Sequence, residues 1–305
     1  MDWFPFILSV LGLCVFEIVS SIDNAVVNAD VLATMDKKWR KWFLVWGIFL
    51  GVFLVRGLLP WVIVWVANPD LGMWGSLTAT FSNDPHLKES LERSAPPLLL
   101  GGGIFLVFLF FHWLFLEPKN FGLPAEQFFA KQGAWFYAIV SILLTVITWL
   151  ALKQDQIMAF AASLGASFYF ITHGFKEHAA RVEVEMKGRK DLSDISKLFY
   201  LEVLDATFSI DGVVGAFAFT MSVPVIILGN GLGAIVVREF TIRGVEYIRK
   251  YAYLKNGAMY SILFLGIVMV LESFHVHVPH YVAPVSTFVI IGFFLFKSHQ
   301  ELKKG

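Results

Sequence analysis

Cysteine is nearly absent from this chain, because Cys14 is the only one among 305 residues. A single cysteine excludes an internal disulfide and a metal site built from several cysteines. Charge is also scarce: Asp, Glu, Lys and Arg make up 16% of the residues, and the formal net charge is zero. No overall field therefore favours nucleic acid as a partner. The N-terminus lacks the positively charged segment and the cleavage site of a secretory signal peptide.

Apolar residues dominate the chain at 57% of the total, with a mean hydropathy of +0.68. A soluble domain is about 45–50% apolar. A helix needs roughly 20 apolar residues to cross a ~30 Å hydrocarbon core, and nearly charge-free runs recur along the sequence. The sequence therefore predicts an all-α polytopic membrane protein in the lipid bilayer. About nine spans are expected, at 3–30, 42–67, 96–116, 134–152, 156–173, 197–220, 223–246, 256–273 and 281–297.

Lys and Arg are distributed unevenly between the connecting segments. The odd-numbered loops, the C-terminal tail and the span ends next to them hold 19 of them, whereas the even-numbered loops hold only Lys88, Arg93 and Lys153. Cytoplasmic loops carry the excess of positive charge. The pattern therefore predicts an external N-terminus, a cytoplasmic C-terminus and an odd number of spans.

Two stretches of the sequence share the pattern acid-x3-Ser-Ile-Asp. They are EIVSSIDNAV at 17–26 and DATFSIDGVV at 205–214. The spans that follow also correspond, because each carries two matching glycines and then an arginine, Arg56 or Arg238. The ordered combination indicates an internal duplication. The paired positions, offset by 188, are Glu17 with Asp205, Ser21 with Ser209, and Asp23 with Asp211.

The predicted topology inverts the two copies, because the first span runs inward and the sixth runs outward. Many secondary transporters are built from such inverted repeats, with the binding site near the midplane where the repeats meet. The expected organisation is a first repeat unit at 1–116, two inserted spans and a basic cytoplasmic linker at 117–196, and a second unit plus a final span at 197–305.

Each carboxylate near the bilayer centre costs about 2.5–3.5 kcal/mol on insertion scales, so four of them indicate a function. Two arginines against four acids leave a formal charge of minus two, which suits one divalent cation or two protons. The alternative is that the arginines merely pair with the acids and hold the helices together. We hypothesise that the helices unwind locally near Ser21 and Gly212, because such unwinding would let the acids converge.

The predicted ligands contain only oxygen donors, which favours a hard ion such as Mn²⁺, Ca²⁺ or Mg²⁺. Asp23 and Asp211 are expected as central ligands. Glu17 and Asp205 are expected as ligands or proton carriers, since carboxylates release protons when they bind metal. Asn24 is expected as a further ligand through its neutral oxygen. The supporting residues are Ser21, Ser209 and Asn230 as neutral oxygen donors, with Arg56 and Arg238 setting the local charge.

Other candidates are weaker. Glu202 lies one turn before Asp205 and is an alternative ligand. His275, His277 and His280 form an alternative metal site at the outer end of the eighth span. The segment 174–196 has alternating charges, which predicts a solvated helix and linker without chemistry.

These motifs resemble those of the TerC-like family of integral membrane proteins, within the LysE-like transporter superfamily. The resemblance covers the two repeat units. It implies metal-ion homeostasis, most often manganese export, in a bacterial inner membrane. The matching residues are Glu17, Ser21, Asp23, Asn24, Arg56, Asp205, Phe208, Asp211, Asn230 and Arg238.

The sequence thus predicts a transporter of a divalent cation, with manganese favoured and coupled to protons. It predicts no enzyme activity, no resident cofactor and no particular oligomeric state. Two alternatives stay open: an exporter of an organic cationic solute, and a non-transporting factor that assists the assembly of other membrane proteins.

Overall fold

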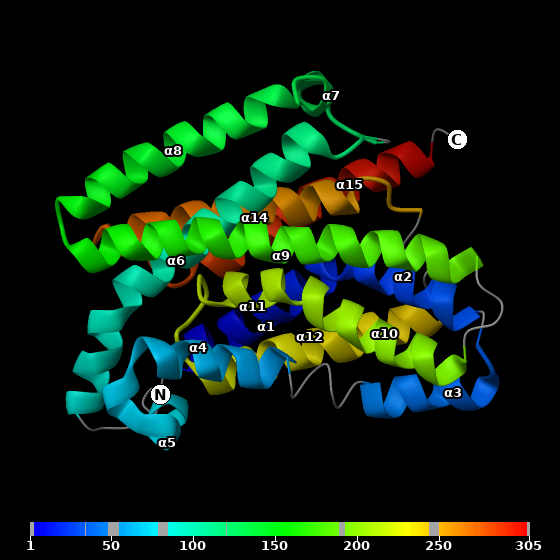
Figure 1. Ribbon diagram of the computed structural model, residues 1–305, viewed down its shortest axis with the longest axis horizontal. Coiled ribbons are helices and arrows are strands. Elements are labelled where there is room, and N and C mark those ends of the chain that lie inside the picture. Colours follow the sequence, from blue (N-terminus) through cyan, green and yellow to red (C-terminus); the bar gives the residue numbers. More distant parts are fainter. Residues whose placement is uncertain are drawn as a thin grey trace.

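In the computed structural model, the residues described are 3–33, 35–47, 55–78, 85–119, 121–188, 193–243 and 250–303. Every regular element in these ranges is helical, which confirms the all-α prediction (Figure 1). In chain order the elements are α1 (Trp3–Ser20), α2 (Ile22–Ala33), α3 (Lys37–Trp42), η1 (Phe43–Gly47), α4 (Leu59–Ala67), η3 (Pro69–Leu71), α5 (Gly72–Thr78), α6 (Pro85–Leu116), α7 (Pro124–Ala130), α8 (Ala134–Leu152), α9 (Gln156–Gly188), α10 (Asp194–Phe208), α11 (Ile210–Ala216), α12 (Val223–Arg243), α14 (Leu254–Ser273) and α15 (Val282–Leu302).

Seven of the described helices are long and apolar enough to cross a bilayer. They confirm a polytopic membrane protein, although the sequence predicted about nine spans. The predicted span at 197–220 is divided between α10 and α11, which are each too short to qualify. The predicted span at 42–67 lies partly outside the described residues, and the helical part at Val55–Ala67 is short. The seven are Trp3–Ser20, Arg93–Leu116, Ala134–Leu152, Gln156–His178, Val223–Thr241, Leu254–Ser273 and Val282–Leu302.

Glycine lets α1 pack closely against α12. A Cβ atom on Gly229 would lie 2.5 Å from the Cβ of Leu13, and one on Gly233 would lie 2.6 Å from the Cβ of Glu17. Both distances are too short for real side chains, so only glycine fits at these positions. Small residues four apart allow membrane helices to approach in this way. This contact brings the helix that carries Glu17 against the second repeat unit.

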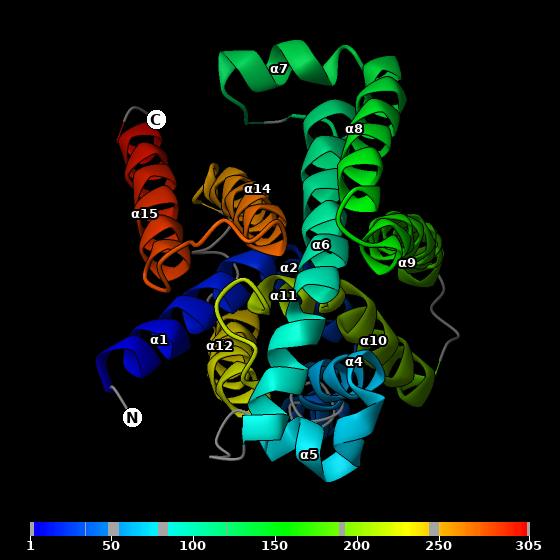
Figure 2. The same cartoon turned by 90° about the vertical axis from the view of Figure 1, so that its left-hand side faces the viewer.

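Helix α8 lies at the edge of the bundle (Figure 2). Its large apolar side chains face outward, with Trp135 at 59% exposed, Ile142 at 64% and Trp149 at 58%. Such a surface is stable in hydrocarbon and costly in water. We therefore place this side of α8 against lipid.

The two predicted repeat motifs adopt the same local structure. Helices α1 and α2 meet at Ser21, and α10 and α11 meet at Ser209, which are equivalent positions of the repeat. In Figure 1 the α1–α2 segment runs toward the right of the view and α10–α11 runs back toward the left. The two copies are therefore antiparallel to one another.

The break at each serine is a bend and not the unwound segment that was hypothesised. The amide of Ser21 still donates to the carbonyl of Glu17 at 3.1 Å, and the amide of Ser209 donates to Asp205 at 3.0 Å. The Ser209 hydroxyl also donates to the Asp205 carbonyl at 2.5 Å. A serine that bonds back to the preceding turn bends a helix. Glu17 and Asp205 therefore converge while the backbone hydrogen bonds at the two serines are kept.

Candidate functional site

Glu17 lies near the C-terminal end of α1 and is completely buried. Its Oε1 accepts hydrogen bonds from the Ser21 hydroxyl and from Nε of Arg56, both at 2.7 Å. The Arg56 guanidinium approaches the same oxygen through Nη2 at 2.6 Å, and its side chain is 3% exposed. A buried charge requires a charged or hydrogen-bonded partner. Arg56 and Ser21 supply both kinds of partner to one oxygen of Glu17.

Asp205 on α10 brings the second repeat unit into contact with this pair. Its Oδ1 accepts a hydrogen bond from the Asn24 amide at 2.6 Å. Its Oδ2 lies 3.3 Å from Nη1 of Arg56 and 3.9 Å from Nη2 of Arg238. Arg56 therefore bridges Glu17 and Asp205, the two acids that the sequence paired between the repeats.

Arg238 on α12 extends the network toward η1. Its guanidinium donates to the Phe43 carbonyl at 2.6 Å, lies 4.2 Å above the Phe43 ring, and is 3.7 Å from the Glu202 carboxylate. Glu202 was the weaker candidate in the sequence, and the structure places it in the same network. We call the following set the carboxylate cluster: Glu17, Asn24, Arg56, Glu202, Asp205 and Arg238.

Gly212 on α11 borders the second oxygen of Glu17. A Cβ atom at this position would lie 2.6 Å from Oε2 of Glu17, so glycine is required for the carboxylate to approach the α11 backbone. The Asn230 amide donates to the Gly212 carbonyl at 3.4 Å. Glu17 therefore lies between Arg56 on one side and α11 on the other.

Asp211 has a partner that the sequence did not indicate. Its Oδ2 lies 2.5 Å from Nζ of Lys176 on α9, and the two side chains are 15% and 13% exposed. Lys176 belongs to the segment predicted as a solvated linker without chemistry. The predicted helix is confirmed, because α9 continues to Gly188. The prediction of solvated side chains is wrong for Lys176, which is 13% exposed and pairs with Asp211. The side chain of Asp23 lies outside the described residues, so its role as a central ligand stays a prediction.

These contacts add Glu202 and Lys176 to the charged groups that the sequence predicted, and their opposite charges cancel. The described side chains comprise four acids and three basic groups. Asp23, the remaining acid of the predicted set, lies outside them, so the predicted charge of minus two stays a prediction. The acids are Glu17, Glu202, Asp205 and Asp211, and the basic residues are Arg56, Lys176 and Arg238.

Several buried oxygens around the network accept no hydrogen bond from the residues that the structure describes. Two belong to carboxylates, Oε2 of Glu17 and Oδ1 of Asp211, and two are the amide oxygens of Asn24 and Asn230. An unsatisfied buried acceptor costs about 1–3 kcal/mol. Native structures usually explain such groups by function or by a bound water or ion. All four residues were predicted from the sequence as ligands or supporting donors.

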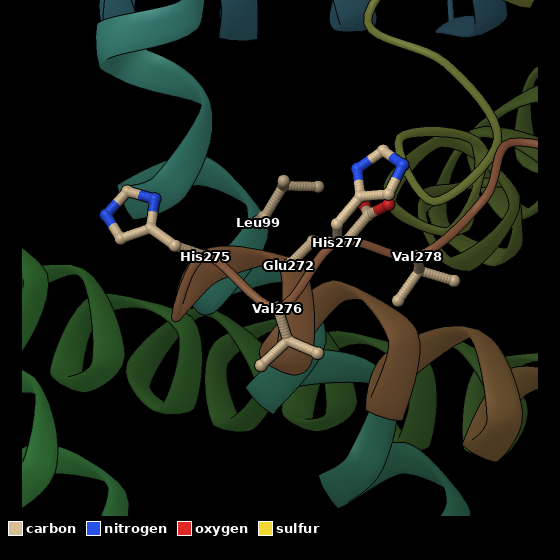
Figure 3. Close-up of a pocket in the computed structure, with 6 residues that line it drawn as sticks. All are labelled: Leu99, Glu272, His275, Val276, His277 and Val278. Carbon is tan, nitrogen blue, oxygen red and sulfur yellow. The ribbon is translucent and has the colours of Figure 1, made fainter.

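The histidines at the other predicted metal site do not converge. His275 and His277 line a surface pocket with Glu272, and their imidazole rings project toward opposite sides of the view (Figure 3). His275 has a φ of 62°, an uncommon conformation for a residue other than glycine, directly after α14 ends. Within the described residues, these histidines do not form a group with metal-binding geometry.

Comparison with known proteins identifies a matching family profile and proteins of similar sequence. A family profile described as "Protein of unknown function (DUF475)" matches residues 22–304. The chain is 32% identical over 80 residues to the uncharacterized membrane protein YceF of Bacillus subtilis, which covers 26% of the chain and 31% of that protein. It is 28% identical over 152 residues to a UPF0053 protein of Haemophilus influenzae, which covers 48% of the chain and 61% of that protein. The chain thus spans less than two thirds of each relative's length. No solved structure matches it.

The predicted membership of the TerC-like family is wrong, because the profile that covers nearly the whole chain is that of another family. The resemblance rested on short motifs around Glu17 and Asp205. Patterns of a few acids and serines recur wherever a buried polar site is built into a helix, so they do not identify a family. The manganese export that the resemblance implied loses this support.

Proposed function

This chain belongs to the DUF475 family, and we propose that it is a membrane transporter that carries a hard divalent cation at the carboxylate cluster. The observation that carries the proposal is the position of Glu17 and Asp205, which are buried between two antiparallel repeat units and share one arginine. Inverted-repeat transporters bind their substrates at such a place. The proposal assigns no catalytic step to the protein.

In this proposal, Arg56 and the transported cation alternate as the positively charged partner of Glu17 and Asp205. Its guanidinium uses one oxygen of Glu17 and one of Asp205, so it acts as an internal counter-ion for both acids. A divalent cation that binds these carboxylates competes with the guanidinium, and Arg56 then withdraws. The two arrangements give two states of the interface between the repeats, as alternating access requires.

The oxygen donors favour a hard ion, and Mn²⁺ is the first ion to test together with Ca²⁺ and Mg²⁺. Because carboxylates must be deprotonated to bind metal, proton exchange is the natural coupling. The predicted orientation, with an external N-terminus in a bacterial inner membrane, belongs to the same proposal.

Flux into proteoliposomes tests this function. We expect the protein to carry one or more of Mn²⁺, Ca²⁺ and Mg²⁺, and we expect excess lysine not to compete. Asp23→Asn and Asp211→Asn are each expected to reduce the flux on the order of tenfold, the effect of about 1.4 kcal/mol. Inhibition by lysine would favour an organic cation as substrate. If no ion moves faster than in protein-free vesicles, the proposal is wrong.

A further inference from the structure

A second group of potential metal ligands lies between α6 and α9, and it shares no residue with the carboxylate cluster. It consists of His112 on α6 with His173 and Glu177 on α9, and each contributes a ligand atom within 4.8 Å of the others. The centroids of the two imidazole rings are 3.8 Å apart and their planes are tilted by 55°. Helices α6 and α9 cross in contact with one another (Figure 1). Residues 61 positions apart in the sequence thus meet at one point.

The separation of the ligand atoms is compatible with a shared metal ion. Nε2 of His173 lies 3.4 Å from Oε1 of Glu177, and these residues are four apart on one helix face. Two ligands that bind zinc at about 2.0–2.1 Å in tetrahedral geometry are themselves roughly 3.4 Å apart. His112 then provides a third ligand from the neighbouring helix, and a water molecule can complete the coordination.

The surroundings orient the ligands and keep the site accessible. Tyr169 stacks on the ring of His173, with centroids 5.7 Å apart and planes 9° apart, and Phe136 meets the edge of His112. Oε1 of Glu117 lies 4.0 Å from Nδ1 of His112, and the other oxygen of this carboxylate pairs with Lys255 at 2.7 Å. The side chain of Glu177 is 55% exposed, so the site is not enclosed by the protein on this side.

We propose that His112, His173 and Glu177 form a binding site for a borderline divalent cation such as Zn²⁺. Two imidazoles and one carboxylate suit such an ion better than Ca²⁺ or Mg²⁺, which prefer oxygen ligands alone. Lys176 lies between His173 and Glu177 in the sequence and pairs with Asp211. Metal binding here fixes α9 against α6 next to this ion pair, and it does so whether or not the carboxylate cluster transports a cation.

Calorimetric titration of the purified full-length protein with Zn²⁺, without a histidine tag, tests the site. We expect binding that is at least about tenfold weaker in His112→Ala and in His173→Ala. Glu177→Gln is expected to weaken binding as well, and it is a change at a partly exposed position that leaves the fold intact. Titration with Co²⁺ should give the visible absorption of a site with nitrogen ligands in the wild-type protein, and this absorption should be weaker in His112→Ala and in His173→Ala.

His178→Ala is the matched control, because His178 is an exposed histidine on the same helix outside the group. His277→Ala controls for the histidines at the far end of α14. Both variants should bind Zn²⁺ as the wild type does. Zn²⁺ affinity that is unchanged in Glu177→Gln and His173→Ala, or lost in His178→Ala or His277→Ala, would overturn the proposal.

Discussion

Replacing Asp205 with Asn is expected to lower cation flux by roughly 10- to 100-fold. A bond to a charged group is worth about 1.5–3 kcal/mol, and every 1.4 kcal/mol corresponds to a factor of ten. Asp205 is the position with the largest expected effect, because it contacts Asn24, Arg56 and Arg238 at once. Asn keeps the shape of the side chain and an oxygen for the Asn24 amide, but it removes the charge that a cation requires. Ion flux in proteoliposomes at equal protein content measures the effect.

Asp155→Asn is the matched control for this change. Asp155 is exposed, and its Oδ1 accepts a hydrogen bond from the Ile157 amide at 3.1 Å at the start of α9. Asn caps a helix N-terminus as well as Asp does, so Asp155→Asn should retain the wild-type flux. Equal flux in Asp205→Asn and Asp155→Asn would remove Asp205 from the transport pathway.

Replacing Arg56 with Gln is expected to destabilise the protein by about 3–5 kcal/mol. Removing one partner of a buried ion pair leaves an uncompensated charge, which costs this amount. Among the described residues, Glu17 is then left without a cationic partner, and Asp205 keeps the more distant Arg238. Thermal unfolding in detergent, in the presence of a chelator, should show a fall in Tm of roughly 10 °C.

Arg181→Gln controls for the loss of an arginine in general. Its guanidinium is 77% exposed and lies 3.6 Å from Glu177, and exposed pairs contribute about 0–1 kcal/mol. The double variant Glu17→Gln with Arg56→Gln should recover part of the lost stability, because the unpaired carboxylate is gone. If Arg56→Gln unfolds at the same temperature as Arg181→Gln, the charges at the cluster are not buried as described.

The repeat motif predicted the main features of the site. Because the motif places an acid four residues before a serine in both copies, Glu17 and Asp205 could be expected at equivalent positions, whereas the unwinding hypothesised near Ser21 and Gly212 is not observed. The arginine in each following span could be expected to pair with these acids, because an unpaired charge in the bilayer is energetically unfavourable. The structure confirms that Arg56 and Arg238 both lie near Asp205.

The contributions of α9 could not be predicted in the same way. Alternating charges after residue 174 are typical of a solvated helix, yet Lys176 reaches inward because its long side chain spans the gap to Asp211. His112 and His173 have no common sequence pattern, since their proximity depends on how α6 packs against α9. Close packing of this kind is set by small residues: a Cβ on Gly165 would collide with the carbonyl of Gly101. The family could likewise be identified only from similarity along most of the chain, because short motifs do not distinguish one family from another.

The position of a bound cation tests the central claim most directly. Crystals grown with saturating Mn²⁺ should show an anomalous scattering peak about 2.0–2.6 Å from carboxylate oxygens of Glu17 and Asp205. Arg56 should then be displaced from at least one of these acids, and the peak should be lost in Asp205→Asn. A structure in which Arg56 still bridges Glu17 and Asp205, with Mn²⁺ bound elsewhere or not at all, would contradict the proposed transport site.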